Sequence, residues 1–304
     1  MKVLVTGALK LQGEGLRLLN AAGLEVTYHP DESVRVKNPE LYEAVVCNGL
    51  FLHQPLSEFI SLRMIQLTSA GCDRVPAEEI AARRIMLFPA KGVYSKPLAE
   101  SVVCGLLQLY RQTRYFDKNQ QSHRWEKHRG LMELCGKTAC IVGAGSIGTE
   151  IAKRLRSFDM QVFGLDVQPR KDDCYTCMYP LSDMDDILHV SHAVILSLPL
   201  TSDTKGMFGK AHFDKMRDNA VFVNIARGSL VDEAALAAAL SSGKLLGAVL
   251  DVFEQEPLPG TSPLWDMENV IITPHNAFVS DEADKRLFQL VYTNLLKETD
   301  EIYA

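Results

Sequence analysis

The chain has 304 residues, of which 47% are hydrophobic and 23% are charged, and its formal net charge is −6. This composition is typical of a folded globular protein and excludes a disordered chain, which would be poor in apolar residues. The negative charge gives no general attraction to nucleic acid or to anionic membranes, and no apolar run approaches the roughly 20 residues that a membrane span needs. The length predicts about two domains.

The first third of the chain alternates short apolar segments with helical patterns. The opening residues, MKVLVTG, predict a first strand and not a signal peptide, because the apolar run is short and soon turns polar. Strands are predicted at 2–6, 44–47, 64–68 and 85–88, and helices at 11–22 and 76–83.

A long helix is predicted after this first unit. Residues 100–121, which follow Pro97, have apolar side chains at helical spacing and few residues that break helices. The apolar side chains exceed what one domain face needs, so we expect a second copy of the chain to cover part of this helix. The following segment, 122–136, is polar and irregular.

The alternation of strands and helices starts again at residue 139. Strands that are apolar throughout, separated by helices, indicate parallel strands covered on both faces. The sequence therefore predicts an α/β fold with two doubly wound parallel-sheet domains. The strands of the second unit are predicted at 139–143, 162–166, 193–199, 220–226, 246–253 and 269–275, and an amphipathic helix follows at 280–298.

The seven cysteines are scattered along the chain and odd in number. This pattern favours reduced thiols in a cytoplasmic protein over a framework of disulfides. Cys174 and Cys177 form a C-x-x-C pair, but no second pair and no histidines at zinc spacing accompany it. We therefore expect no metal site.

A glycine motif, Gly143-x-Gly145-x-x-Gly148, follows the first strand of the second unit and opens a helix. In a dinucleotide-binding unit the first glycine makes the tight turn, the second allows close approach of the pyrophosphate, and the third lets helix and strand pack closely. The amides of Ser146 and Ile147 would then point into an anion site at the helix N-terminus.

Asp166 ends the next predicted strand, eighteen residues beyond Gly148. A carboxylate there can accept hydrogen bonds from both ribose hydroxyls of NAD and would repel the 2′-phosphate of NADP. Arg170 and Lys171 lie nearby in sequence and weaken this discrimination. The sequence favours NAD as cofactor.

Three motifs with charged residues follow, each at the C-terminal end of a predicted strand: NIARG, DVFEQEP and TPH. In an open α/β sheet this edge is where ligands bind. The motifs bring Arg227, Glu256 and His275 to it, which makes these three residues the candidates for catalysis.

Together with GAGSIG, SLPLTSDTKG and SPLWDMENVIITPH, the order of these motifs resembles the D-isomer-specific 2-hydroxyacid dehydrogenase family. The resemblance covers most of the chain and is strongest over 137–276. It implies that Arg227, Glu256 and His275 are the catalytic residues. It also implies a Rossmann NAD-binding domain, 99–278, inserted into a flavodoxin-like substrate domain made of 1–98 and 279–304.

The resemblance implies further cofactor contacts and a twofold dimer formed through the cofactor domain. Asp251 would accept a hydrogen bond from the nicotinamide carboxamide. The other implied cofactor contacts are Leu198, Pro199, Thr204, Ile225 and Ala226, together with Arg227 and His275.

The three candidate residues also suit the reduction of a 2-oxo acid on chemical grounds. The reaction needs a hydride for carbon, a proton for oxygen and a cation for the carboxylate, and NADH supplies the hydride. His275 can donate and reaccept a proton, and Glu256 beside it would stabilise the imidazolium and hold its tautomer. Arg227 can bind the carboxylate and polarise the carbonyl.

The substrate loops of the first unit are less informative. Ser69, Ala70 and Gly71 resemble the family's loop whose backbone amides bind the substrate carboxylate. Tyr94 stands where the family often has an asparagine–threonine pair, so it could face the substrate. The loop at 48–52 is apolar apart from Asn48, whereas phosphoglycerate dehydrogenases carry basic residues there. A small or apolar 2-oxo acid is therefore expected in preference to 3-phosphoglycerate.

Two other functions are compatible with the sequence. A non-enzymatic NAD-sensing corepressor could share the fold. Such a protein would not need Arg227, Glu256 and His275, so the presence of all three argues against this function. A formate dehydrogenase would need no proton acceptor for a hydroxyl, and that subfamily has Gln where this chain has Glu256. The favoured reading is an NAD-dependent reductase of a small 2-oxo acid.

Overall fold

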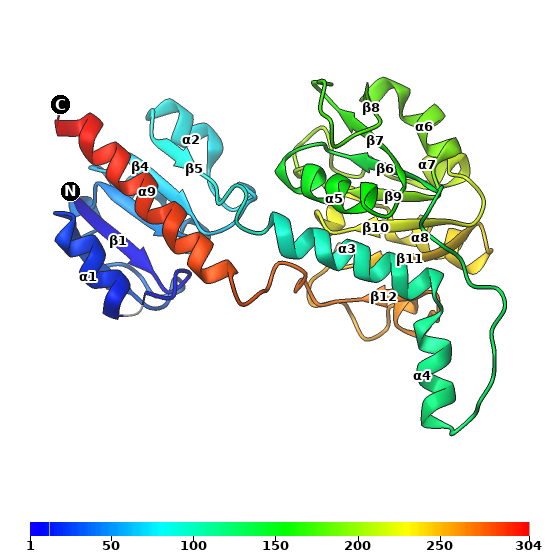
Figure 1. The fold of residues 1–304 in the computed structure, drawn as a ribbon. Coiled ribbons are helices and arrows are strands. Elements are labelled where there is room, and N and C mark those ends of the chain that lie inside the picture. Colours follow the sequence, from blue (N-terminus) through cyan, green and yellow to red (C-terminus); the bar gives the residue numbers. More distant parts are fainter. Residues whose placement is uncertain (12, 304) are drawn as a thin grey trace. The chain divides into compact units, whose positions relative to one another are not determined.

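The computed structural model describes residues 1–11 and 13–303. The chain forms two compact units, which Figure 1 shows in colours that follow the sequence. The first unit combines Met1–Tyr94 with Val279–Ala304, and the second is Ser95–Phe278. The second unit is thus inserted into the first. None of the described helices is both long and apolar enough to cross a membrane.

The first unit contains a five-stranded sheet in the order β2-β1-β3-β4-β5, and all its strand pairs are parallel. This 2-1-3-4-5 order is the flavodoxin-like one. The strands are β1 (Lys2–Thr6), β2 (Glu25–His29), β3 (Ala44–Cys47), β4 (Met64–Leu67) and β5 (Met86–Phe88). The α-helices of the first unit are α1 (Gly13–Ala21), α2 (Ala77–Ala82) and α9 (Ala283–Tyr303).

The alternation of side chains along β1 explains why both faces of this sheet are covered. Val3 and Val5 belong to a core cluster with Leu19 of α1 and Val291 of α9. Leu4 points the other way and belongs to a cluster that contains residues of the loops and of α2. Successive side chains of a strand point to opposite faces, so a strand buried on both sides is apolar throughout.

The second unit contains a seven-stranded sheet in the order β12-β11-β10-β9-β6-β7-β8, again entirely parallel. Six of these strands repeat the 3-2-1-4-5-6 order of a Rossmann sheet, with β6 first in the chain. The strands are β6 (Thr138–Val142), β7 (Gln161–Asp166), β8 (Cys177–Pro180), β9 (Ala193–Leu196), β10 (Ala220–Asn224), β11 (Leu245–Leu250) and β12 (Val270–Ile272).

The helices of the second unit cover a core that includes Val142, Val194, Phe222 and Leu250. The expected fold, two doubly wound parallel-sheet domains, is confirmed. The helices are α3 (Ser95–Tyr110), α4 (Thr113–Gln121), α5 (Ser146–Arg156), α6 (Met184–Val190), α7 (Lys210–Lys215) and α8 (Glu233–Ser241).

The single helix expected over 100–121 is wrong. The chain forms α3 and α4 instead, separated at Gln112, whose φ of 54° is left-handed. The Gln112 side chain donates to the carbonyl of Leu109 and so helps to end α3. Because no proline or glycine stands at the break, the sequence pattern gave no sign of it.

Candidate active site

The glycine motif makes the turn between β6 and α5. Gly143 has a φ of 94°, and a Cβ there would lie 2.7 Å from the Cα of Leu198. A Cβ on Gly148 would lie 2.4 Å from the carbonyl oxygen of Gly143. Only glycine fits these two positions without displacing backbone.

Gly145 differs from its two neighbours in the motif, because nothing lies within 4 Å of the position of its Cβ. The open space beside it suits a pyrophosphate, which needs close approach to the backbone. Helix α5 begins at the next residue, Ser146, so its first amides add an anion-binding N-terminus. The residues present therefore fit a dinucleotide.

Asp166, at the end of β7, is tied to this turn. Its Oδ2 accepts a hydrogen bond from the Ala144 amide at 2.9 Å, and its Oδ1 accepts one from the Gln168 amide at 3.1 Å. Arg170 reaches the same turn from the other side and donates to the Ala144 carbonyl at 2.8 Å and to Thr149 Oγ1 at 3.2 Å. A carboxylate and a guanidinium thus both lie where the ribose of a dinucleotide is expected.

The loop after β9 packs on the glycine turn. Ser197 donates to the Gly143 carbonyl at 2.6 Å, and Leu198 lies directly against Gly143. Thr204 folds the loop, because its hydroxyl donates to the Pro199 carbonyl at 2.8 Å. The predicted cofactor residues Leu198, Pro199 and Thr204 therefore form one structure with the glycine motif.

Arg227 lies on a turn that begins at the end of β10. The turn is held by Asn224, whose buried side chain accepts from the Ala226 amide at 3.1 Å and donates to the Arg227 carbonyl at 2.9 Å. Its residues Ile225 and Ala226 are buried.

Gly228 brings this turn against the loop that follows β11. A Cβ on Gly228 would lie 1.8 Å from the carbonyl carbon of Phe253, so any larger residue would push the two loops apart. The turn that carries Arg227 is therefore packed against the loop that leads to Glu256.

His275 and Glu256 form the central pair of the site. The imidazole Nδ1 lies 2.8 Å from Glu256 Oε2, and the side chains are 33% and 37% exposed. The other oxygen of Glu256 accepts from the Phe253 amide at 3.1 Å. Because a carboxylate can only accept, this contact favours the tautomer with the proton on Nδ1 and leaves Nε2 available to another partner.

Asp251 anchors the backbone around His275. Its carbonyl accepts from the His275 amide at 2.8 Å, and its buried carboxylate accepts from the Thr273 hydroxyl, the Asn276 amide and the Ala277 amide. These bonds hold His275 in a left-handed conformation with a φ of 49°, which costs free energy for a non-glycine residue unless its surroundings fix it. The carboxylate thus positions the loop, and its contact with a carboxamide stays a prediction.

The candidate substrate loop belongs to the first unit and follows β4. Ser69 closes it by donating to the Gly71 carbonyl at 2.8 Å, with Ala70 between them. Tyr94 donates its hydroxyl to the carbonyl of Thr68 at 2.5 Å, so the ring supports the start of the loop. Burial, and secondarily the charge of Asp284, raises the pKa of Tyr94 to about 12, which keeps this hydroxyl a donor at neutral pH.

Two further residues shape the site although the sequence analysis did not select them: Asn224, which opens the motif NIARG, and Thr273, which opens TPH. Each is a polar residue at or just beyond the end of an apolar strand, and each bonds to the segment carrying a candidate catalytic residue. A buried polar group needs a partner, so a polar residue at such a position is the signal that could have found them.

Comparison with known proteins places these features in a family. Residues 103–277 match the model for the D-isomer specific 2-hydroxyacid dehydrogenase, NAD binding domain. A glyoxylate reductase of Thermofilum pendens is 36% identical over 78% of this chain and 71% of its own length. A D-3-phosphoglycerate dehydrogenase of Archaeoglobus fulgidus is 31% identical over 97% of this chain, which spans only 57% of that relative.

The fold is shared as well. The crystal structure of a D-isomer specific 2-hydroxyacid dehydrogenase family protein from Aeromonas salmonicida superposes with a TM-score of 0.83 at 29% identity, covering 99% of this chain and 96% of the other. The chain belongs to the D-isomer-specific 2-hydroxyacid dehydrogenase family.

Proposed function

We propose that this protein is an NAD-dependent reductase that converts a small 2-oxo acid into the D-2-hydroxy acid. The observation that carries the proposal is the 2.8 Å contact between His275 and Glu256, on the edge of a dinucleotide-binding sheet that also presents Arg227. A histidine held by a carboxylate is suited to proton transfer, and family membership supplies the class of reaction.

Each residue has a separate role in this proposal. When bound, NADH supplies the hydride to the carbonyl carbon. His275 donates a proton to the carbonyl oxygen, and Glu256 stabilises the imidazolium before that transfer. Arg227 binds the substrate carboxylate and polarises the carbonyl, and the amides of Ala70 and Gly71 give the carboxylate further donors.

The pH dependence of turnover tests the His275–Glu256 pair. In a Glu256→Gln variant, the rate of 2-oxo acid reduction should fall off at lower pH than in the wild type. The amide removes the negative charge that lies 2.8 Å from His275 Nδ1, so it stabilises a positively charged imidazole less than the carboxylate does. The check is a profile of kcat/KM against pH for both proteins, with Glu254→Gln as a control on the same loop. Coincident profiles for wild type and Glu256→Gln would remove Glu256 from this role.

Cofactor preference tests Asp166. We expect NADH to be favoured over NADPH by at least about tenfold in kcat/KM, which corresponds to about 1.4 kcal/mol. The carboxylate repels a 2′-phosphate, while Arg170, which lies against the same turn, opposes this effect. Asp166→Asn should narrow the preference and Arg170→Ala should widen it. Equal efficiency of the wild type with both cofactors would contradict the assignment.

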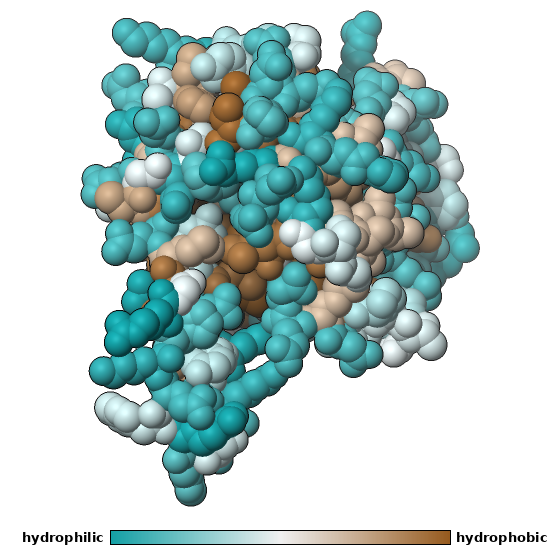
Figure 2. Space-filling model, turned by 90° about the vertical axis from the view of Figure 1, so that its right-hand side faces the viewer, coloured by the Kyte–Doolittle hydropathy of each residue, from teal (hydrophilic) through white to brown (hydrophobic). Residues whose placement is uncertain are grey.

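We also propose that the protein is a homodimer with the segment 100–121, which forms most of α3 and all of α4, at the interface. Of its apolar side chains, Val102, Leu106, Leu109 and Tyr110 are buried within the unit. Two large hydrophobic side chains are exposed on the arm formed by α4 and 122–133: Trp125 is 96% exposed and Phe116 is 37% exposed. Figure 2 shows hydrophobic side chains exposed beside the base of this arm.

Light scattering at micromolar concentration measures the assembly directly. We expect a mass of about 68 kDa, twice the 33.8 kDa of one chain. Trp125→Ser should shift the equilibrium toward the monomer, because a fully exposed indole gains the most from burial at an interface. A stable species of one-chain mass for the wild type would rule out the dimer.

We further expect the protein in the cytoplasm, where its seven unpaired thiols would stay reduced.

A further inference from the structure

The segment after β2 crosses over the end of β1 in the first unit. The Gly7 amide donates to the His29 carbonyl at 2.9 Å, and a Cβ on Gly7 would lie 2.0 Å from the carbonyl oxygen of Pro30. Glycine at position 7 is therefore what allows the crossing. Because the segment crosses there, Glu32, which follows β2 in the chain, lies between the ends of β1 and β3.

There the Glu32 carboxylate accepts three short hydrogen bonds. Its Oε1 accepts from the Thr6 hydroxyl at 2.6 Å and from the Asn48 amide at 2.7 Å, and its Oε2 accepts from the Gly49 amide at 2.6 Å. Among the described residues, no lysine, arginine or histidine forms an ion pair with it. Neutral donors alone thus bind a full negative charge, so this group of Thr6, Asn48 and Gly49 is an anion cradle that the chain's own carboxylate fills.

The position of the cradle in the fold is the reason to connect it with a ligand. In the order β2-β1-β3-β4-β5, the strand that follows β1 in the chain, β2, is added on one side of β1, and the next strand, β3, is added on the other side. The point between β1 and β3 is therefore a topological switch point. Ligands of open α/β sheets bind at such a switch point, outside the carboxyl ends of the strands. The Glu32 carboxylate occupies that point.

The candidate substrate loop lies on the same edge, next to the cradle. The Thr68 amide donates to the Cys47 carbonyl at 2.9 Å, so the chain leaving β4 runs beside Asn48. Neighbouring strands are about 4.8 Å apart, which places the loop at Ser69 roughly one to two strand spacings from the cradle. A three-carbon 2-oxo acid with a terminal phosphate spans a comparable length.

We propose that Glu32 is a specificity-determining residue that excludes 2-oxo acids with a phosphate at the end remote from the 2-oxo group. The inference rests on the proposed function, because it assumes that the substrate carboxylate binds at Ser69–Gly71. Glu32 acts in two ways: it occupies the donors that a phosphate would use, and its charge repels the phosphate. Substrates with an uncharged remote end are unaffected by either.

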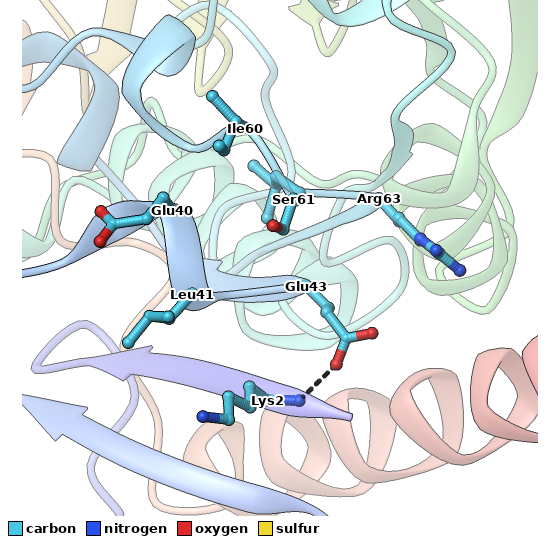
Figure 3. Close-up of a pocket in the computed structure, with 8 residues that line it drawn as sticks. Lys2, Glu40, Leu41, Glu43, Ile60, Ser61 and Arg63 are labelled. Atoms are coloured by element: carbon cyan, nitrogen blue, oxygen red, sulfur yellow. Dashed lines mark hydrogen bonds between the residues drawn. The ribbon is translucent and has the colours of Figure 1, made fainter.

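A hollow elsewhere in the first unit provides the matched control. The hollow has a volume of about 480 Å³ and is lined by Lys2, Glu40, Glu43 and Arg63 among others, which are drawn in Figure 3. It lies where β1, β3 and β4 begin, at the edge opposite to the cradle. Its charges are of both signs, and Glu43 accepts from the Lys2 amide at 2.8 Å. Glu40, exposed at this hollow, can lose its charge without affecting the cradle.

The test compares hydroxypyruvate with 3-phosphohydroxypyruvate, which differ only in the phosphate. The measured quantity is the ratio of their kcat/KM values with NADH, phosphorylated over unphosphorylated. Glu32→Gln removes the charge and leaves the cradle filled, and Glu32→Ala also empties it. We expect the ratio to rise at least about threefold in the first variant and at least tenfold in the second, with Glu40→Ala unchanged. A ratio that stays within twofold of the wild type in both Glu32 variants would overturn the proposal.

Binding of inorganic phosphate separates a failure of this inference from a failure of the proposed function. If the wild type reduces no 2-oxo acid, the proposed function fails, but the cradle can still be tested by titrating phosphate calorimetrically into each protein. Millimolar phosphate should bind to Glu32→Ala and raise its Tm, because the anion replaces the lost acceptor of Thr6, Asn48 and Gly49. No binding to a folded Glu32→Ala protein would overturn the cradle. Equal phosphate binding to wild type would do so as well.

Discussion

Replacing His275 with alanine is expected to lower kcat for 2-oxo acid reduction by about 10²–10⁴-fold, the usual loss on removing a general acid. The imidazole held by Glu256 at 2.8 Å is the proposed proton donor, and alanine has no proton to give. NADH binding should change little, because the glycine turn between β6 and α5 is untouched. Stopped-flow absorbance at saturating substrate measures kcat, and NADH fluorescence measures binding.

His189→Ala is a suitable control for the His275 variant. His189 is exposed on α6 in the same unit, so its loss should leave kcat near the wild-type value. If His275→Ala also kept near-normal turnover, a different group would have to donate the proton.

Replacing Arg227 with lysine should lower kcat/KM by about 10²–10³-fold, the range observed when one donor to a developing oxyanion is removed. Lysine keeps the charge but lacks the planar fork that binds a carboxylate through two parallel hydrogen bonds. The turn should keep both bonds of the Asn224 side chain, to the Ala226 amide and to the Arg227 carbonyl, and lose the bond from Arg227 Nη1 to the Ala226 carbonyl.

A change of arginine to lysine elsewhere in the same unit controls for general effects of the substitution. Arg156 is exposed on α5 and donates to Thr176 Oγ1, so Arg156→Lys should leave kcat/KM within about twofold. A loss of less than threefold in Arg227→Lys would mean that bidentate binding of the substrate is not its role.

The sequence was most informative where strands are apolar throughout. AVVC of β3 and AVFVN of β10 are buried at every position, and both were predicted. Two edge strands of the described sheets were missed, whereas the edge strands β5 and β12, which are apolar throughout, were predicted. EVTYH of β2 and CMYP of β8 pair on one side only and carry exposed or half-buried residues, so neither shows the continuous apolar run that marks a central strand.

The candidate site was predictable to the extent that its residues stand in motifs at strand ends. Arg227, Glu256 and His275 were named as candidates in this way, and the structure brings Glu256 and His275 into contact. The bonds of Asn224 were not predicted, although its position at the end of an apolar strand was a signal for them, and the cradle around Glu32 gave no such signal. Glu32 meets Thr6 and Asn48 only because a loop crosses a strand end, and no local pattern connects residues so far apart in the chain.

The chain is proposed to transfer hydride from NADH to a 2-oxo acid with His275 as proton donor. The most direct measurement supplies NADH deuterated at the transferring position, offers hydroxypyruvate, glyoxylate and pyruvate in turn, and follows the products by NMR. We expect deuterium at C2 of each 2-hydroxy acid, and the D configuration in the products of hydroxypyruvate and pyruvate. In His275→Ala the deuterated product should be almost completely lost. Binding of NADH with no transfer to any of these acids would contradict the account and would be the behaviour of a cofactor sensor.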